Sequence, residues 1–167
     1  MNAIFTRRSV RHFSDKPIEN EKIETLLRAA MQAPSAANQQ PWSFIVVRGR
    51  ENLDELSKYN AYAGCLKNAD AAIIVLGDSK RMILPDMWQQ DLAAATQNIQ
   101  LQAVELGLGT VWLGTAPHKT RMEFICNLFE IDEHLLPYSV IAVGYPKKED
   151  ANHFIDRFDP ERVRYIN

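Results

Sequence analysis

The most constraining feature of the sequence is a long helical segment that carries almost no charge. Between Asp91 and Glu105 there is no charged residue, although a helix with one face in solvent normally carries charges there. Its apolar side chains are interleaved with uncharged hydrogen-bonding ones, which can be buried only when they have partners. Pro85 and Asp86 favour its start and Gly107 its end, so the helix has about 21 residues and a length of roughly 30 Å. We expect one face in the core and another against a partner chain; an ordinary central core helix is the alternative.

Length and charge narrow the class of protein. With 167 residues, the chain is expected to form a single domain over residues 1–167. A formal net charge of −2 disfavours nucleic acid as a partner, because binding the phosphate backbone needs a basic surface. No apolar run approaches the ~20 residues of a membrane helix, and the charged start does not have the order of a signal peptide, so we expect a cytoplasmic protein. Cys65 and Cys126 lie far apart, which favours neither a disulfide framework nor a metal site.

A basic segment, RRSVR, lies near the start of the chain. If it is extended, its side chains alternate, so Arg7, Ser9 and Arg11 point one way while Arg8 and Val10 point the other. Two guanidinium groups and a hydroxyl would then converge, and guanidinium groups bind phosphate oxygens in a bidentate manner. We expect an anion here, and a solvated basic turn is the alternative.

The loop from Pro34 to Trp42 contains no charge. It offers hydroxyl, amide and backbone groups beside an aromatic ring, a mixture that suits a planar polar ligand. A tight connection capped by Ser35 and Asn38 is the alternative. The next segment, Ser43–Val47, is expected to be a buried strand.

The glycines between Gly107 and Gly114 do not form a dinucleotide-binding fingerprint, because they follow a helix and enter a strand. The pattern predicts a helix stop, a buried strand and then, at Gly114, a bare backbone that lets a ligand approach closely. Five further elements are expected: an amphipathic helix at Glu19–Gln32 with Met31 facing inward, an exposed helix at Glu51–Tyr59, a strand at Ala71–Leu76 buried on both faces, a helix at Thr120–Leu128 and a strand at Ser139–Gly144. The tail from Phe154 to Tyr165 either packs on the body or reaches a neighbouring molecule.

Standard catalytic motifs are missing from the sequence, and the four histidines show no paired ligand spacing. An enzyme without its own side-chain machinery usually obtains its chemistry from a cofactor.

Four motifs, in order along nearly the whole chain, carry a resemblance to a known family. RRSVRHF, APSAANQQPWSFIVV, DLAAATQNIQLQAVELGLGTVWLG and DRFDPERV resemble the nitroreductase family of homodimeric, FMN-dependent NAD(P)H oxidoreductases. The resemblance implies an α+β fold, in which a central mixed or antiparallel sheet is flanked by helices and completed in a homodimer with FMN at the subunit interface.

The resemblance also implies a set of cofactor-binding residues. They are Arg7, Arg8, Ser9 and Arg11 for the phosphate, ribityl chain and pyrimidine edge; Pro34, Ser35, Ala36 and Asn38 from the other subunit; Trp112, Leu113 and Gly114 beside the ring, with a backbone N–H near flavin N5; and Arg157 for the phosphate. Two departures accompany it. Ile155 stands where many relatives have a lysine, a loss for which Arg8 could compensate, and the short chain lacks a helical excursion that covers the active site of longer relatives.

The implied activity is hydride transfer from NADH or NADPH through flavin N5 to a small acceptor, nitroaromatic or quinone-like, by a ping-pong mechanism. The flavin performs the chemistry, no side chain is catalytic, and Arg11 and the backbone of Gly114 assist. Three alternatives remain open: reductive dehalogenation or flavin breakdown on the same fold, a non-catalytic protein that stores or senses FMN, and a cofactor-free dimeric interaction domain.

Overall fold

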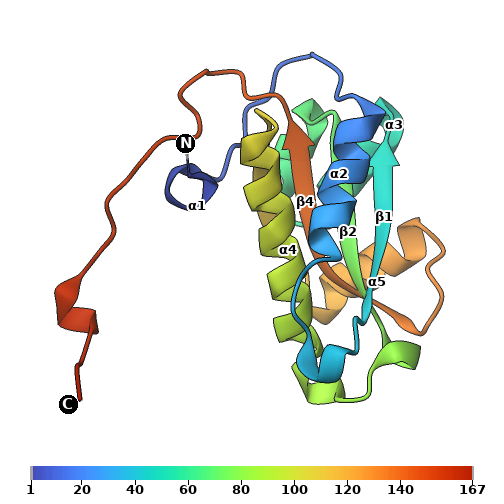
Figure 1. Cartoon of the computed structure of the whole chain (residues 1–167). Coiled ribbons are helices and arrows are strands. Elements are labelled where there is room, and N and C mark those ends of the chain that lie inside the picture. The colour runs from blue at the N-terminus through green and yellow to red at the C-terminus, as the bar shows by residue number, and fades with distance from the viewer. Residues whose placement is uncertain (1, 167) are drawn as a thin grey trace.

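A four-stranded antiparallel sheet lies between two layers of helices in the computed structural model, which describes residues 2–166 (Figure 1). The strands are β1 (Trp42–Arg48), β2 (Ala71–Asp78), β3 (Gly109–Gly114) and β4 (Leu135–Gly144), in the order β1-β2-β4-β3. The helices are α1 (Ala3–Thr6), α2 (Asn20–Ala30), α3 (Arg50–Leu56), α4 (Trp88–Glu105) and α5 (Lys119–Leu128). This arrangement confirms the expected α+β class with a central antiparallel sheet.

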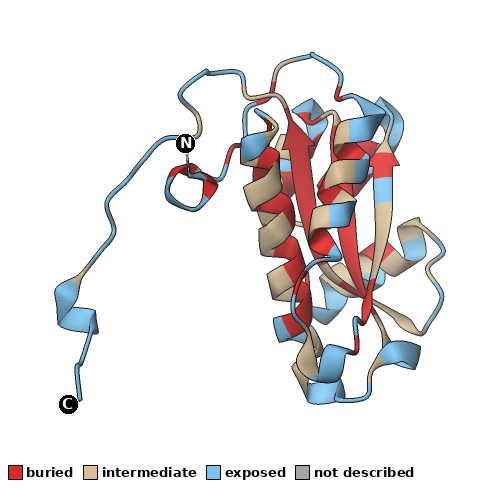
Figure 2. Ribbon diagram, in the orientation of Figure 1, coloured by how far each residue is buried: buried red, intermediate tan, exposed pale blue. Residues whose placement is uncertain are grey.

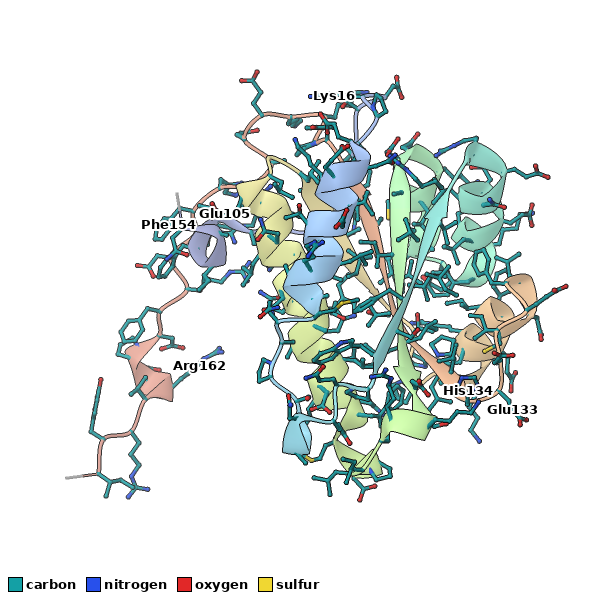
Figure 3. All side chains as sticks on the ribbon, turned by 45° about the vertical axis from the view of Figure 1, so that its right-hand side comes forward. Lys16, Glu105, Glu133, His134, Phe154 and Arg162 are labelled. Atoms are coloured by element: carbon teal, nitrogen blue, oxygen red, sulfur yellow. The ribbon has the colours of Figure 1, made fainter. Side chains whose placement is uncertain are left out.

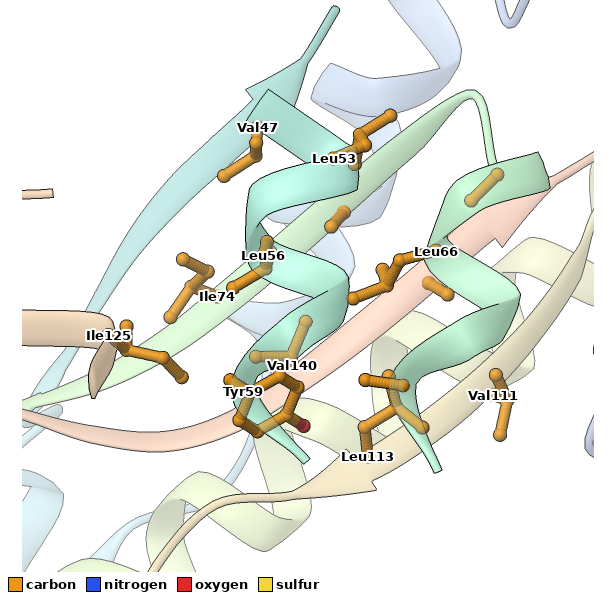
Figure 4. Packing of buried hydrophobic residues seen from close by; sticks show 14 of the residues in the cluster. Val47, Leu53, Leu56, Tyr59, Leu66, Ile74, Val111, Leu113, Ile125 and Val140 are labelled. Atoms are coloured by element: carbon orange, nitrogen blue, oxygen red, sulfur yellow. The ribbon is translucent and has the colours of Figure 1, made fainter. Parts of the chain in front are cut away.

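Strand β2 contributes side chains to both hydrophobic cores, one on each face of the sheet. Ile73 and Val75 pack with α2 and α4 on one face, whereas Ile74 and Leu76 pack with α3 and α5 on the other (Figure 4). The strand is buried along its apolar length because successive side chains point to opposite faces and both faces are covered. The prediction for residues 71–76 is confirmed.

Helix α4 has the predicted position and covering. It follows a 3₁₀ turn at Pro85–Met87, and the chain leaves it through Gly107, whose φ is +73°. Its inner face, which includes Leu92 and Ile99, is completely buried. Between Asp91 and Glu105 the uncharged residues on its remaining sides are half-buried, whereas Gln89 and Gln90 in the first turn and Glu105 at the end are exposed. The low charge of the helix therefore reflects cover by its own chain on most sides, while contact with a partner chain stays a prediction.

Three expectations about local burial were wrong. Met31, expected to face inward, is 50% exposed because α2 ends at Ala30 and Met31 already belongs to its cap. Strand β1, expected to be buried, lies at the edge of the sheet, where Val46 is exposed. Helix α3, expected to be exposed, buries Leu53 and Leu56 completely, since residues three apart share one helix face.

The C-terminal tail leaves the body of the molecule after β4 (Figures 1 and 2). Phe154 still contacts Phe5, with ring centroids 6.2 Å apart, whereas Arg162 lies well away from the sheet and helices (Figure 3). Beyond Phe154 the tail exposes large apolar side chains, and Phe158 and Tyr165 are 73% and 81% exposed. Such a run of apolar groups gains nothing from folding until another surface covers it.

Candidate functional site

The basic segment near the N-terminus is fixed to the outer edge of β3. Ser9 forms a parallel bridge with Thr110, and the Val10 N–H donates to the Thr110 carbonyl at 2.9 Å. Val10 is buried against Gly109, where a Cβ atom would lie only 2.8 Å from the valine side chain. The absence of a side chain at Gly109 therefore allows the segment to dock, and docking holds the flanking arginines along the sheet edge.

Three arginines meet where this segment approaches the tail. Arg7, Arg8 and Arg157 line a hollow of about 330 Å³ together with aromatic and aliphatic side chains. Burial, followed by the charges of Arg8 and Arg157, lowers the pKa of Arg7. None of the ion pairs formed among residues 2–166 involves these three side chains, although Asp156 also borders the hollow. Unpaired positive charge held together in this way is a site for a polyanion such as a phosphate group.

Part of the Arg8 guanidinium group is hydrogen-bonded to backbone carbonyls. Its two terminal nitrogens donate to the carbonyls of Arg7 and Phe5, at 2.5 and 3.1 Å, and its Nε is buried without a partner among the described residues. A buried donor of this kind needs an acceptor, which a ligand can supply. The structure thus places Arg8 beside Arg7, whereas strict alternation predicted opposite sides; the reason is that Arg7 caps α1 and the extended run begins only after it.

A second hollow adjoins the first along the same segment. It has a volume of about 620 Å³, and Ser9, Arg11, Lys147 and Lys148 contribute its polar groups. Arg11 and Ser9 therefore face this hollow and Arg7 faces the other, so the three side chains are spread along one edge and do not converge on one spot. Arg11 also lies near the half-buried Cys65, whose thiol has its pKa raised by burial and lowered in part by the arginine charge.

The outer edge of β3 presents free peptide groups. The Thr115 N–H donates to the Tyr138 carbonyl. In the register between β3 and β4, every second residue of β3 counted back from Thr115 has its peptide groups directed at β4 in the same way. The peptide groups of Thr110, Trp112 and Gly114 therefore point away from β4. Thr110 uses its carbonyl to hold Val10, which leaves the edge open from Trp112 to Gly114.

Gly114 is the most accessible point of this edge. It is exposed, and a Cβ atom built on it would meet nothing within 4 Å. Arg121 donates to its carbonyl at 2.9 Å, so a guanidinium group holds the end of the strand. Because Gly114 itself has no side chain, a flat ligand can approach the backbone closely here.

The two other predicted residues of β3 have different surroundings. Trp112 packs edge-on against Tyr138, with ring centroids 5.8 Å apart, and Tyr138 packs in the same way against Trp88. Leu113 is buried in the core on the α3 and α5 side, and its peptide faces β4. The structure therefore directs the side chain of Leu113 away from the open edge.

The uncharged loop lies at the opposite end of α4 from the basic segment. The Ala36 N–H donates to the carboxylate of Asp91, in the first turn of the helix, whereas α1 and Glu105 lie near its last turn (Figures 1 and 3). An 18-residue helix is about 27 Å long. Within the described part of one chain, no hydrogen bond joins residues 34–38 to residues 7–11 or 112–114. The predicted site residues therefore form two groups that one chain does not bring together.

Sequence reasoning missed the groups beneath the open edge. Tyr59, Cys65, Thr115 and Arg121 gather there from separate turns of the chain, and burial raises the pKa of Tyr59 to about 12. No spacing or motif links these residues, because only the packing of the 57–68 segment against β3 brings them together. Gln39, which is buried beside Asp91, was likewise missed, since the sequence presents it as one more polar loop residue.

Within residues 2–166, no group of histidine, cysteine and acidic side chains has the arrangement of a metal site. Over the same part of the chain, none of the helices combines the length and apolar character needed to cross a membrane.

Comparison with known proteins gives a consistent result. The model of the nitroreductase family matches residues 4–90 and 60–145. A protein of Archaeoglobus fulgidus with the provisional name NADH dehydrogenase/NAD(P)H nitroreductase is 49% identical over 98% of this chain and 95% of its own. A crystal structure from Clostridium acetobutylicum, provisionally named an NADH oxidase, superposes with a TM-score of 0.93 at 50% identity over 97% of both chains. An FMN-dependent nitroreductase from Clostridium difficile superposes with a TM-score of 0.90 at 30% identity, over 99% of this chain and 98% of its own.

Proposed function

The chain belongs to the nitroreductase family, and on that premise we propose that it is an FMN-dependent NAD(P)H oxidoreductase whose active sites are completed in a homodimer. The observation that carries the proposal is the cluster of Arg7, Arg8 and Arg157, whose positive charge has no paired carboxylate among the described residues. The basic segment is bridged to Thr110 of β3, so the arginine cluster and the open edge from Trp112 to Gly114 lie along the same side of the sheet.

The residues present fit FMN. The three arginines would hold its phosphate, and the buried, unpartnered Nε of Arg8 would gain an acceptor. Ser9 and Arg11 would contact the ribityl chain and the pyrimidine edge from the larger hollow. The free N–H groups of Trp112 and Gly114 would meet the ring, and Gly114, which has no side chain, leaves space for it.

Two features support a homodimer. The loop containing Ser35 and Asn38 lies a helix length away from the basic segment of its own chain, so a second chain running the opposite way along α4 would supply it. The exposed apolar tail, which includes Phe158 and Tyr165, would then be covered by the partner. An uncharged, half-buried helix surface and an uncovered apolar arm are together typical of an obligate interface.

When bound, FMN supplies hydride transfer between a reduced nicotinamide and an acceptor. The protein's part is to bind and orient. Arg11 would place a positive charge at the pyrimidine edge, where it would stabilise negative charge. The Gly114 N–H would donate to the ring at the open edge of β3, and the loop around Asn38 of the second chain would shelter the ring from water. Because the same slot admits a flat donor and then a flat acceptor, we expect ping-pong kinetics with nitroaromatic or quinone-like acceptors.

The spectrum of freshly purified protein tests this function. We expect a yellow dimer with the absorbance of bound FMN, or a colourless protein that becomes yellow when FMN is added. Anaerobic addition of NADH or NADPH should bleach the colour, and a quinone should restore it. A yellow protein that neither nicotinamide bleaches would be a binding or sensing module. A monomer that ignores FMN would overturn the proposal.

A further inference from the structure

A single buried amide joins two surface segments to the start of α4. The Gln39 side chain is 6% exposed and Asp91 is 4% exposed. Gln39 Oε1 accepts from the N–H groups of Ile83 and Leu84, at 2.8 and 2.9 Å. Its Nε2 donates to Asp91 Oδ2 at 2.6 Å and to the Leu84 carbonyl at 3.3 Å. Every polar position of the amide is therefore occupied.

These partners leave only one suitable side chain at position 39. Two donors face the amide oxygen and two acceptors face the amide nitrogen. Rotating the amide, or replacing it by a carboxylate, would therefore place donors against donors or acceptors against acceptors. The remaining oxygen of Asp91 accepts from the Ala36 N–H at 2.9 Å. The amide and the carboxylate together tie the 34–40 loop to the 79–87 segment and to α4.

The loop held in this way has an unfavourable backbone. Ala37, Asn38 and Gln40 have φ values of 49°, 51° and 46°, a left-handed conformation that residues with a Cβ atom rarely adopt. Such a conformation persists only where its surroundings determine it. The bonds at Ala36 and Gln39 hold the loop within its left-handed turn, and the Gln40 N–H closes it by donating to Ser35 Oγ at 3.0 Å.

We propose that Gln39 is a positioning residue: through Asp91 it holds the 34–38 loop in the shape in which a second subunit's flavin meets it. The inference rests on the proposed function for the identity of that ligand. Gln39 also locks Ile83 and Leu84, which are 69% and 45% exposed, beside the same loop. The apolar pair and the polar loop thus form one rigid surface for the partner subunit.

Four variants test the role of Gln39 in the full-length protein. Gln39→Leu removes all four hydrogen bonds at similar volume, Gln39→Glu sets two carboxylates face to face, and Asp91→Asn leaves Ala36 or Gln39 without an acceptor. Each should raise the dissociation constant of FMN, measured by quenching of flavin fluorescence, at least tenfold. Combining Gln39→Glu with Asp91→Asn restores the donor–acceptor match between the two side chains and leaves only the 3.3 Å contact with the Leu84 carbonyl unmatched. The double variant should therefore bind FMN more tightly than either single variant. Gln89→Leu, an exposed position at the start of α4, is the matched control.

Hydrogen exchange of the FMN-free protein gives a readout that does not depend on the ligand. In Gln39→Leu, the segments 34–40 and 80–88 should exchange at least tenfold faster, while β2 and β4 stay protected. The inference is overturned if wild type binds FMN and the single variants bind it equally well, or if the double variant binds no better than the single ones. If wild type does not bind FMN, the proposed function fails, and the exchange rates still decide whether Gln39 holds the loop.

Discussion

At the scale of single residues, charge placement matters more here than net charge. The chain is slightly acidic overall, yet Arg7 lies close to Arg8 and Arg157, and burial followed by these two charges lowers its pKa. Folding brings like charges together only where other interactions offset the repulsion, and a bound anion removes it. The residue types of the basic segment predicted an anion site, and the resemblance assigned Arg157 to the same phosphate. The structure shows that Arg157, 150 positions along the chain from Arg7, borders the same hollow.

Arg11 is expected to act on the reaction more than on binding. It is exposed at the larger hollow, where its charge would stabilise the reduced state. Arg11→Ala should slow flavin reduction by NADH about 30-fold at saturating FMN, which corresponds to about 2 kcal/mol, while FMN affinity falls by much less. Stopped-flow absorbance measures both. Arg28→Ala, which removes an exposed arginine on α2 that pairs with Glu24, is the control, and an unchanged rate would remove Arg11 from the mechanism.

Tyr59 predicts a loss of stability in alkali. Burial raises the pKa of its hydroxyl from 10.0 to about 12 in the folded protein, so the unfolded chain releases this proton first. The contribution is complete below pH 10 and is lost as the pH rises towards 12, with a size of about 3 kcal/mol. Urea unfolding from pH 8 to 11.5 should show a steeper decline for wild type than for Tyr59→Phe. Tyr62→Phe, at a 76% exposed position, should behave like wild type; equal slopes for all three proteins would contradict the assignment.

At the scale of elements, the sheet edge and the segment docked on it depend on glycines. Gly144 makes room for Phe13 just as Gly109 does for Val10, since a Cβ atom at either position would lie within 3 Å of the neighbouring side chain. These two contacts hold the segment that follows α1 against the start of β3 and the end of β4. The glycine at the helix stop was interpreted correctly from the sequence, but the close approach at Gly109 was not, because the sequence does not show which segment packs there.

Gly109→Ala tests this docking. The added methyl group would overlap the Val10 side chain, and overpacking of this kind costs about 1–3 kcal/mol. We expect a lower unfolding midpoint and weaker FMN binding together, since displacement of Val10 moves the arginines on both sides of it. Gly64→Ala, where a Cβ atom would meet nothing within 4 Å, should change neither property. Weaker binding without any loss of stability would show that the segment docks by another route.

At the scale of the whole molecule, one described chain leaves the predicted site residues apart and part of its apolar surface uncovered. Its loop and its basic segment lie at opposite ends of α4, and its tail extends away from the body with its apolar side chains uncovered (Figure 2). Asn152 fixes the start of the tail to the body of the molecule, because its side chain accepts from the Arg8 N–H and donates to the Leu108 carbonyl. The proposed homodimer would account for all of these features at once.

Removal of residues 153–167 should separate assembly from folding. Because the two cores lie within the first 152 residues, the shortened protein should remain folded but become monomeric and lose FMN affinity. Light scattering after gel filtration measures the mass, and fluorescence quenching measures the affinity. Arg157→Ala is the control, since it should weaken FMN binding while the dimer remains. A shortened protein that is still dimeric would place the interface elsewhere.

Local patterns in the sequence determined the elements and the family, because helix and strand periodicity, helix stops and motif order are properties of neighbouring residues. They predicted α4, β2 and the basic segment without knowledge of the fold. The tertiary structure alone decided which distant groups meet. Two examples are the polar groups beneath β3 and the amide of Gln39 between Asp91 and Leu84. Both depend on how helices and strands pack, and side-chain contacts between distant segments leave no periodic signal in a single sequence.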